Sequence, residues 1–300
     1  MSKPSPAAGA PSRKPHALIL ITGLVGAFVA SIVWWLLPAR EPDARPRVHF
    51  RLQPPGGHVF RGMTPWSNPL GISPDGTQVI FLAFDSNWGS RLFIRAIGDP
   101  DVREVSGSET SVMPFFSWDG SFVAYSSGNE LWRARLSGGA AEKISDVPLL
   151  KAGAAWGPDN TIVFSWDGSL RKLLPNGGPS DPLGSLEPGE LRHDWPQFLP
   201  DGETLLFTIE TPDGFRPAIL SMTTGEHRVL GELGLGRGAR YVASGHIVLA
   251  ARNQLLAAAF DLPRLEVSSR PVPVLDGVFV ELSSGLAWFT TSESSTGAKS

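Results

Sequence analysis

The chain of 300 residues contains no cysteine. This absence excludes disulfide scaffolds, thiolate zinc sites, cysteine nucleophiles and membrane anchors carried on a lipidated cysteine. Charged residues are also scarce, at 18% of the sequence, whereas glycine (33 residues) and proline (27 residues) are abundant. Many short strands joined by tight turns have this composition, so long helices are not expected beyond the first 40 residues.

Signatures of catalysis and of metal or cofactor binding are missing as well. The chain has no G-x-S-x-G nucleophile elbow, and its glycine-rich stretch 231–238 lacks the G-x-G-x-x-G spacing of a dinucleotide site. No two of its six histidines stand at metal-ligand spacing. These histidines are His16, His49, His58, His193, His227 and His246. The sequence therefore predicts no metal site, no cofactor and no catalytic residues.

The charge distribution argues against nucleic acid as a partner. The first 47 residues contain six Lys/Arg and two acidic residues, so a net charge of −3 for the chain leaves −7 on the remainder. Nucleic-acid affinity depends on clustered Lys and Arg that release counterions from phosphates. A mildly acidic domain does not offer such a surface.

An apolar segment without charged residues covers positions 17–37. A helix of this length spans the roughly 30 Å hydrocarbon core of a bilayer, and Trp34 and Trp35 stand where an interfacial aromatic belt lies. A cleaved signal peptide is the alternative, although the stretch is long for one. The sequence thus predicts a cytoplasmic tail (1–16), a transmembrane helix (17–37) and a linker (38–47). The expected location is the inner membrane, with a single pass and the downstream domain outside the cytoplasm.

A turn motif of the type Ser-Pro-Asp-Gly returns every 40 to 44 residues. Proline presets one dihedral angle, aspartate caps the turn through its side chain, and glycine accepts a positive φ, so these aspartates are expected to be structural. The six occurrences are Ser73–Gly76, Ser117–Gly120, Gly157–Asn160, Leu199–Gly202, Ala243–Gly245 and Ser283–Gly285.

An apolar strand is predicted directly after each turn, and a further strand follows it in most units. The strands after the turns are 79–82, 122–125, 161–164, 205–208, 246–249 and 286–289. The further strands are 91–94, 130–133, 169–172, 218–221 and 255–258. A unit of about 40 residues with several strands is typical of a β-propeller blade. The sequence therefore predicts an all-β, six-bladed propeller over 48–292, complete or short of one strand, with 48–52 closing the ring and a disordered tail at 293–300.

These units resemble TolB-like propeller repeats. More narrowly, 193–202 and 260–274 are similar to the extracytoplasmic propeller of bacterial eukaryote-like serine/threonine kinases, yet the chain lacks the kinase motifs. The resemblance implies a non-catalytic binding, sensor or scaffold module, in this case membrane-anchored, for a protein, peptide or glycan ligand. A separate membrane kinase is a candidate partner. The alternatives are a propeller hydrolase or lyase acting on glycans or lactones, and a truncated receptor remnant.

One polar and aromatic cluster stands out as a candidate ligand site. It comprises Arg192, His193 and Asp194, which precede Trp195 at the start of a blade, where they could face the central channel. The alternative is a hydrogen bond between His193 and Asp194 that orders a loop.

Overall fold

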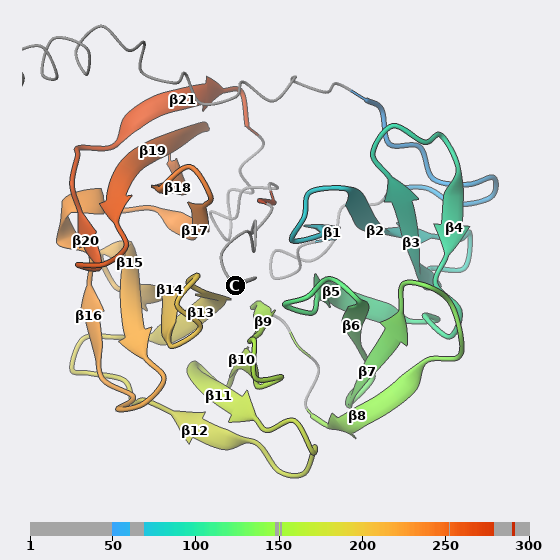
Figure 1. Cartoon of the computed structure of the whole chain (residues 1–300), viewed down its shortest axis with the longest axis horizontal. Helices are drawn as coiled ribbons and strands as arrows, with labels where there is room; N and C mark the ends of the chain where they lie inside the picture. The colour runs from blue at the N-terminus through green and yellow to red at the C-terminus, as the bar shows by residue number, and fades with distance from the viewer. Residues whose placement is uncertain are drawn as a thin grey trace, which may run out of the picture. The chain divides into compact units, whose positions relative to one another are not determined.

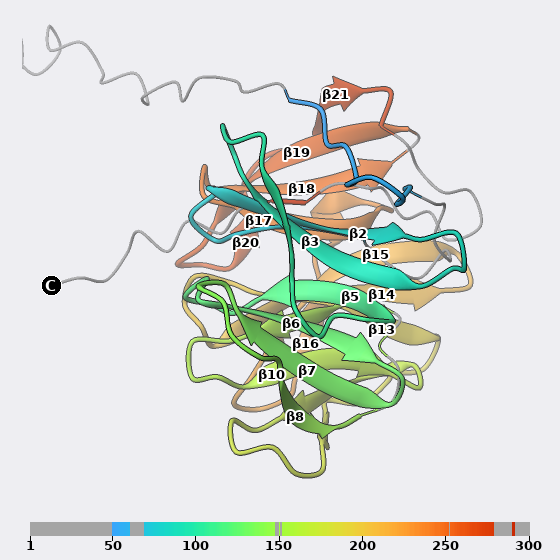
Figure 2. The same ribbon diagram turned by 90° about the vertical axis from the view of Figure 1, so that its right-hand side faces the viewer.

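The computed structural model describes residues 50–60, 69–147, 150, 152–251, 253–278 and 290–291. The chain divides into two compact units, Met1–Leu52 and Gln53–Ser300, and every strand below belongs to the second. Within this unit, five antiparallel sheets follow one another around a common centre (Figure 1). Seen from the side, the strands run between two opposite faces of the unit, and turns and hairpins gather on both (Figure 2).

In each sheet, consecutive strands pair as a meander, except that the last strand of the fifth sheet pairs with the third strand of that sheet. The first sheet consists of β1 (Leu70–Ile72), β2 (Gln78–Phe84), β3 (Ser90–Ala96) and β4 (Val102–Glu104). The second consists of β5 (Ser111–Phe116), β6 (Phe122–Ser127), β7 (Glu130–Arg135) and β8 (Glu142–Asp146). The third consists of β9 (Ala154–Trp156), β10 (Ile162–Trp166), β11 (Ser169–Leu173) and β12 (Asp181–Leu183). The fourth consists of β13 (Arg192–Phe198), β14 (Thr204–Thr211), β15 (Gly214–Ser221) and β16 (His227–Val229). The fifth consists of β17 (Arg237–Val242), β18 (His246–Ala251), β19 (Gln254–Asp261), β20 (Glu266–Val267) and β21 (Val272–Asp276).

The predicted turns join the first two strands of each of these sheets. In the first sheet, Gly76 donates its backbone N–H to the carbonyl of Ser73 at 2.8 Å and has a φ of +72°. The carboxylate of Asp75 accepts hydrogen bonds from the Ser73 hydroxyl and from the backbone N–H of Thr77. The structural role expected for this aspartate is confirmed, because its side chain closes the turn in the way an Asx turn does.

The core lies between consecutive sheets. One cluster of buried side chains, for example, joins Val163, Leu170 and Leu183 of the third sheet to Leu205 and Phe207 of the fourth. Similar clusters join the first sheet to the second, the second to the third, and the fourth to the fifth. Burial of these apolar faces, at about 25 cal/mol per Å² removed from water, holds the blades side by side.

The prediction of six blades is corrected to five sheets in the described part of the chain. Strand β21 is the last described strand, and it pairs with the first half of β19 instead of opening a new sheet. Strand β20 pairs with the end of β19, so two short segments share the outer position of the fifth sheet. The sixth predicted turn and strand, 283–289, lie outside the described residues. Of the predicted closing strand, 48 and 49 lie outside them and 50–52 form no strand.

The predictions of a transmembrane helix and of an inner-membrane location with an extracytoplasmic propeller are corrected too. Within the described ranges, no helix is long and apolar enough to cross a membrane. The helix found there is the three-residue 3-10 turn Gly231–Leu233, whereas a span requires about 20 residues. The segment 17–37 lies outside the described residues.

Candidate functional site

The first strands of consecutive sheets lie next to one another around the centre of the unit, and three of them are interrupted by a bulge. The pairing register shifts between Val112 and Phe115 in β5, between Asp194 and Gln197 in β13, and between Arg237 and Arg240 in β17. A bulge inserts one unpaired residue and re-aims the neighbouring side chains.

The bulges recur at one position of the repeat, six residues before the turn aspartate in the second and fourth sheets. Met113 and Trp195 have positive φ angles of 52° and 60° there, and Gly153, at the equivalent position before β9, has a φ of +92°. A non-glycine residue in this region costs about 1–2 kcal/mol. Such strained positions gather at functional sites, and all three residues line the cavity at the centre.

This central cavity has a volume of about 120 Å³. Its walls come mainly from the first strands of the five sheets and the turns that follow them. Six aromatic residues contribute to its lining: Phe115, Phe116, Trp118, Trp156, Trp195 and Phe198. Among the described residues that line the cavity, Arg240 is the only charged one. The chain therefore places a channel with six aromatic residues in its wall at the centre of the propeller.

Polar groups in the channel wall hold adjacent strands together. The side chain of Gln197 donates to the carbonyl of Tyr241 at 3.1 Å and accepts from its backbone N–H at 2.8 Å. The guanidinium of Arg240 donates to the carbonyl of Trp195 at 3.0 Å. No carboxylate or imidazole is present among the described lining residues, so the described channel wall offers no acid–base pair.

The candidate residues Arg192, His193 and Asp194 are the first three of β13, but they do not line this cavity. Asp194 is 1% exposed; its carboxylate accepts hydrogen bonds from the Ser165 hydroxyl at 2.8 Å and from Arg192 at 3.2 Å. The guanidinium of Arg237, itself buried, lies 3.6 Å from the other carboxylate oxygen. Asp194 therefore ties together the third, fourth and fifth sheets.

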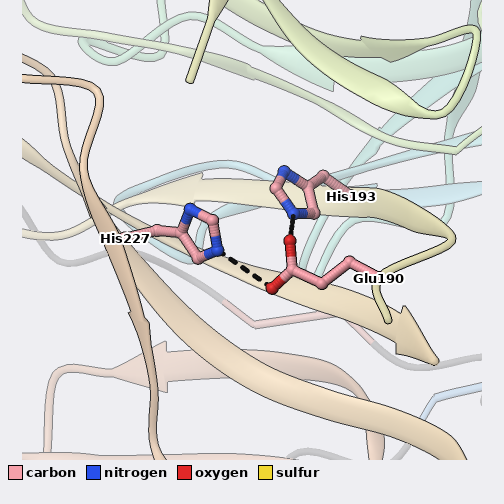
Figure 3. Close-up of side chains that lie close together, drawn as sticks. All are labelled: Glu190, His193 and His227. Carbon is pink, nitrogen blue, oxygen red and sulfur yellow. Dashed lines mark hydrogen bonds and ion pairs between the residues drawn. The ribbon is translucent and has the colours of Figure 1, made fainter. Parts of the chain in front are cut away.

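His193 points elsewhere and joins a cluster with Glu190 and His227 (Figure 3). Its Nε2 lies 2.8 Å from one carboxylate oxygen of Glu190, and the Nε2 of His227 lies 3.0 Å from the other. The ring of Phe207 packs against both imidazoles, with centroid distances of 4.9 and 5.8 Å. The expected alternative, a bond between His193 and Asp194, is thus replaced by a bond to Glu190.

The protonation states in this cluster follow from burial and hydrogen bonding. Burial lowers the pKa of His193, which is 0% exposed, so the neutral imidazole is favoured. Burial also raises the pKa of Glu190, but hydrogen bonds from the backbone of Glu187 and from both histidines outweigh it, and the pKa falls below its ordinary value. An ionised carboxylate therefore lies between two imidazoles, a donor set that could hold a metal ion.

Sequence reasoning missed Glu190 and His227 because the three residues come from separate parts of the chain. His227 follows His193 by 34 positions and belongs to a different strand. The spacing Glu-x-x-His at 190–193 is the single local signal, and it is too common to identify a site.

The fold is that of a TolB-like β-propeller. Solved structures with this architecture include a TolB-type protein of Agrobacterium tumefaciens, at 16% identity and a TM-score of 0.51, aligned over 71% of this chain and 83% of that one. They also include TolB of Acinetobacter baumannii, at 14% identity and a TM-score of 0.54, aligned over 69% of this chain and 54% of that one. A third is an oligogalacturonate lyase of Vibrio parahaemolyticus, at 13% identity and a TM-score of 0.52, aligned over 73% of this chain and 68% of that one.

Identities this low support the shared fold and nothing about activity. The chain spans only 54% of the length of the Acinetobacter protein. No protein-family model matches the sequence, and no curated protein matches it either.

Proposed function

We propose that the chain is a non-catalytic recognition module whose central channel receives an apolar side chain of a peptide or protein partner. The lining of the channel carries this proposal: six aromatic side chains and one arginine surround it in the described part of the chain. Aromatic rings bury large apolar areas, and they are enriched among the residues that dominate binding energy at interfaces.

The size of the cavity favours a peptide over an oligosaccharide. Pockets for small molecules usually enclose about 300–1,000 Å³, whereas this cavity has a volume of about 120 Å³. A space of that size accommodates one large side chain inserted from a partner. The small volume favours insertion of a single side chain over the binding of several sugar rings.

An enzyme acting on glycans or lactones is the competing function, and one structural relative is an oligogalacturonate lyase. Such chemistry needs a group that removes or delivers a proton at the reacting bond. The described lining residues of the channel supply no carboxylate and no histidine. The narrower resemblance to propellers of serine/threonine kinases is compatible with a partner in signalling and stays a prediction.

The test is selection of binding peptides from a random library displayed on phage, with the purified full chain as bait. The dissociation constants of selected peptides are then measured by fluorescence polarisation for the wild type, Trp118→Ala and Trp166→Ala. Trp118 lines the channel, whereas Trp166 is 40% exposed at the hairpin between β10 and β11. We expect Trp118→Ala to weaken binding by about 30-fold, the equivalent of a hot-spot contact of about 2 kcal/mol.

Trp166→Ala should leave the affinity unchanged. Equal affinities of the wild type and Trp118→Ala would place the binding surface outside the channel and refute the proposal. Cleavage of oligogalacturonates by the wild type, lost in Trp118→Ala, would refute the non-catalytic assignment.

A further inference from the structure

The cluster of Glu190, His193 and His227 brings together side chains from three separate parts of the chain. Glu190 lies in the segment 184–191 that leads from β12 of the third sheet to β13 of the fourth. His193 belongs to β13, the innermost strand of the fourth sheet, and His227 begins β16, its outermost strand (Figure 1). A ligand held by all three would clamp the connecting segment onto both edges of one blade.

All three side chains are shielded from solvent. The side-chain exposures of His193, His227 and Glu190 are 0%, 5% and 9%. A carboxylate is costly to bury unless an opposite charge or good hydrogen bonds compensate for it. The two histidines supply one hydrogen bond each, and neither histidine needs to be charged to do so.

The donor atoms suit a late first-row divalent cation. Two imidazole nitrogens and one carboxylate oxygen are preferred zinc ligands, whereas calcium and magnesium take oxygen ligands almost exclusively. Zn²⁺ would moreover supply positive charge beside the buried carboxylate of Glu190.

The ligand atoms of the three side chains lie close enough together for one ion to reach all of them. The ligand atoms lie within 4.8 Å of one another, and the two nitrogen–oxygen contacts measure 2.8 and 3.0 Å. Tetrahedral zinc with bonds of about 2.0–2.2 Å separates its ligand atoms by about 3.3–3.5 Å. The two contacts go to different oxygens of Glu190, so the ion would replace both hydrogen bonds. The ligand atoms, which now lie within 4.8 Å of one another, would settle at separations of about 3.3–3.5 Å.

We propose that Glu190, His193 and His227 bind one Zn²⁺ ion, which fastens the segment 184–191 to the fourth sheet. Phe207 packs against both imidazoles and gives the site an apolar wall. With three protein ligands, a water molecule completes the tetrahedron. Three protein ligands and one water are more typical of catalytic zinc, but the burial of all three side chains leaves no approach for a substrate, so we assign the ion a structural role. The competing arrangement is a hydrogen-bonded clasp of the same three side chains without any ion.

The experiment uses the full chain, freed of metal with a chelator and dialysed. Zn²⁺ affinity is measured by competition with a chromophoric chelator, and Co²⁺ is added separately as a probe of coordination by visible absorption. Glu190→Gln keeps the size and a hydrogen-bonding group but removes the anionic ligand, and His227→Gln removes one imidazole. His246→Gln is the matched control, because His246 bonds to Ser244 in the fifth sheet, away from the cluster.

We expect one equivalent of Zn²⁺ in the wild type and in His246→Gln. The affinity should fall by about 100-fold or more in the other two variants, since loss of a direct ligand exceeds the about 10–100-fold effect of an outer-shell partner. Zn²⁺ should also raise the Tm of the wild type and not that of Glu190→Gln. The absence of stoichiometric Zn²⁺ uptake, or equal affinity in all four proteins, would overturn the proposal.

A second measurement needs no variant and covers the case in which the substituted chains do not fold. X-ray absorption at the zinc edge of the loaded wild type should show only nitrogen and oxygen ligands at about 2.0–2.2 Å, with the outer-shell signal of two imidazoles. A shell of oxygen alone, or of a single imidazole, would place the ion elsewhere and overturn the proposal.

Discussion

Substitution of Gly153 by alanine tests the packing that forms the channel wall. Gly153 has a φ of +92°, and a Cβ atom added to it would lie 2.8 Å from the Cα atom of Trp195 on the neighbouring strand β13. The backbone N–H of Trp195 also donates to the carbonyl of Ala152 at 2.7 Å. The two chain segments therefore approach each other at a point where the collision involves backbone, which has little freedom to move aside.

Gly98 provides a matched control for the conformational part of this effect. It has a φ of +94° in the turn between β3 and β4, and nothing lies within 4 Å of a Cβ atom added there. Both alanine variants incur the cost of a positive φ, about 1–2 kcal/mol. Gly153→Ala additionally overpacks the junction of two blades, at about 1–3 kcal/mol. The expected losses of unfolding free energy are about 1–2 kcal/mol for Gly98→Ala and about 2–5 kcal/mol for Gly153→Ala.

Urea unfolding followed by tryptophan fluorescence measures both losses. The midpoint should shift with an unchanged slope m, which reports a change of stability and not of compactness. Because Gly153 and Trp195 line the cavity, peptides selected on the wild type should also bind Gly153→Ala more weakly. Equal destabilisation by the two substitutions would refute the close approach of Gly153 to β13.

Further predictions concern pH dependence and the core. Burial raises the pKa of Tyr125 to about 12, and its hydroxyl donates to the carbonyl of Gly107 at 2.7 Å. The neutral phenol therefore contributes stability that is fully present below pH 10 and is lost as the pH rises toward 12. In an ultraviolet titration, Tyr125→Phe should lack the tyrosine ionisation near pH 12. The hydrogen bond from Ser73 lowers the pKa of Asp75 below 3.8, so its contribution to stability is present above that value and is lost as the pH falls through the lowered pKa. Asp75→Asn should flatten the acid limb of a plot of unfolding free energy against pH. Phe207 is 0% exposed, and Phe207→Ala should cost about 3–5 kcal/mol in urea unfolding.

Each of these three variants has a control in the same chain. Tyr241→Phe leaves the titration of the other tyrosine in place, and the chain has only 2 tyrosines. Asp213→Asn replaces a carboxylate that is 81% exposed, and Leu174→Ala truncates a side chain in a residue that is 47% exposed. The reasoning fails if a control variant shows the same effect as the variant it is paired with. It also fails if Asp75→Asn leaves the acid limb unchanged or if Phe207→Ala leaves the free energy of unfolding unchanged.

The repeat and its strands were predictable because their causes are local. The hydrogen bonds of Asp75 reach no further than Thr77 and Ser73, so four or five residues contain the whole signal of the turn. For the same reason, the described strands predicted within the repeat units are confirmed apart from position 161, including 205–208 in β14 and 255–258 in β19. Positions 50–52 of the predicted closing strand, which has no such turn before it, form no strand. The sixth blade was predicted from the number of turn motifs alone. That number does not indicate that β21 pairs with β19 of the fifth sheet.

The candidate site shows the opposite case. His193 was selected for its neighbours in sequence, yet its contacts are Glu190, from a connecting segment, and His227, from the far edge of the sheet. Which strand edges face each other depends on sheet order and on the packing of two blades, and no spacing rule encodes this. The bulge at Trp195, which separates the channel-lining side chain from its buried neighbour Asp194, was likewise absent from the strand pattern.

The sequence by itself determined the period, the turns and the alternation of short strands, because hydrogen bonds and dihedral preferences act over a few residues. Tertiary structure alone decided that the five sheets of the described residues surround a channel with aromatic side chains in its wall, that Asp194 joins three of them, and that two histidines share one buried carboxylate. These arrangements arise when apolar faces of successive blades are buried together. Burial is non-directional and acts between residues at any distance along the chain, so it leaves no local signature that could be read in advance.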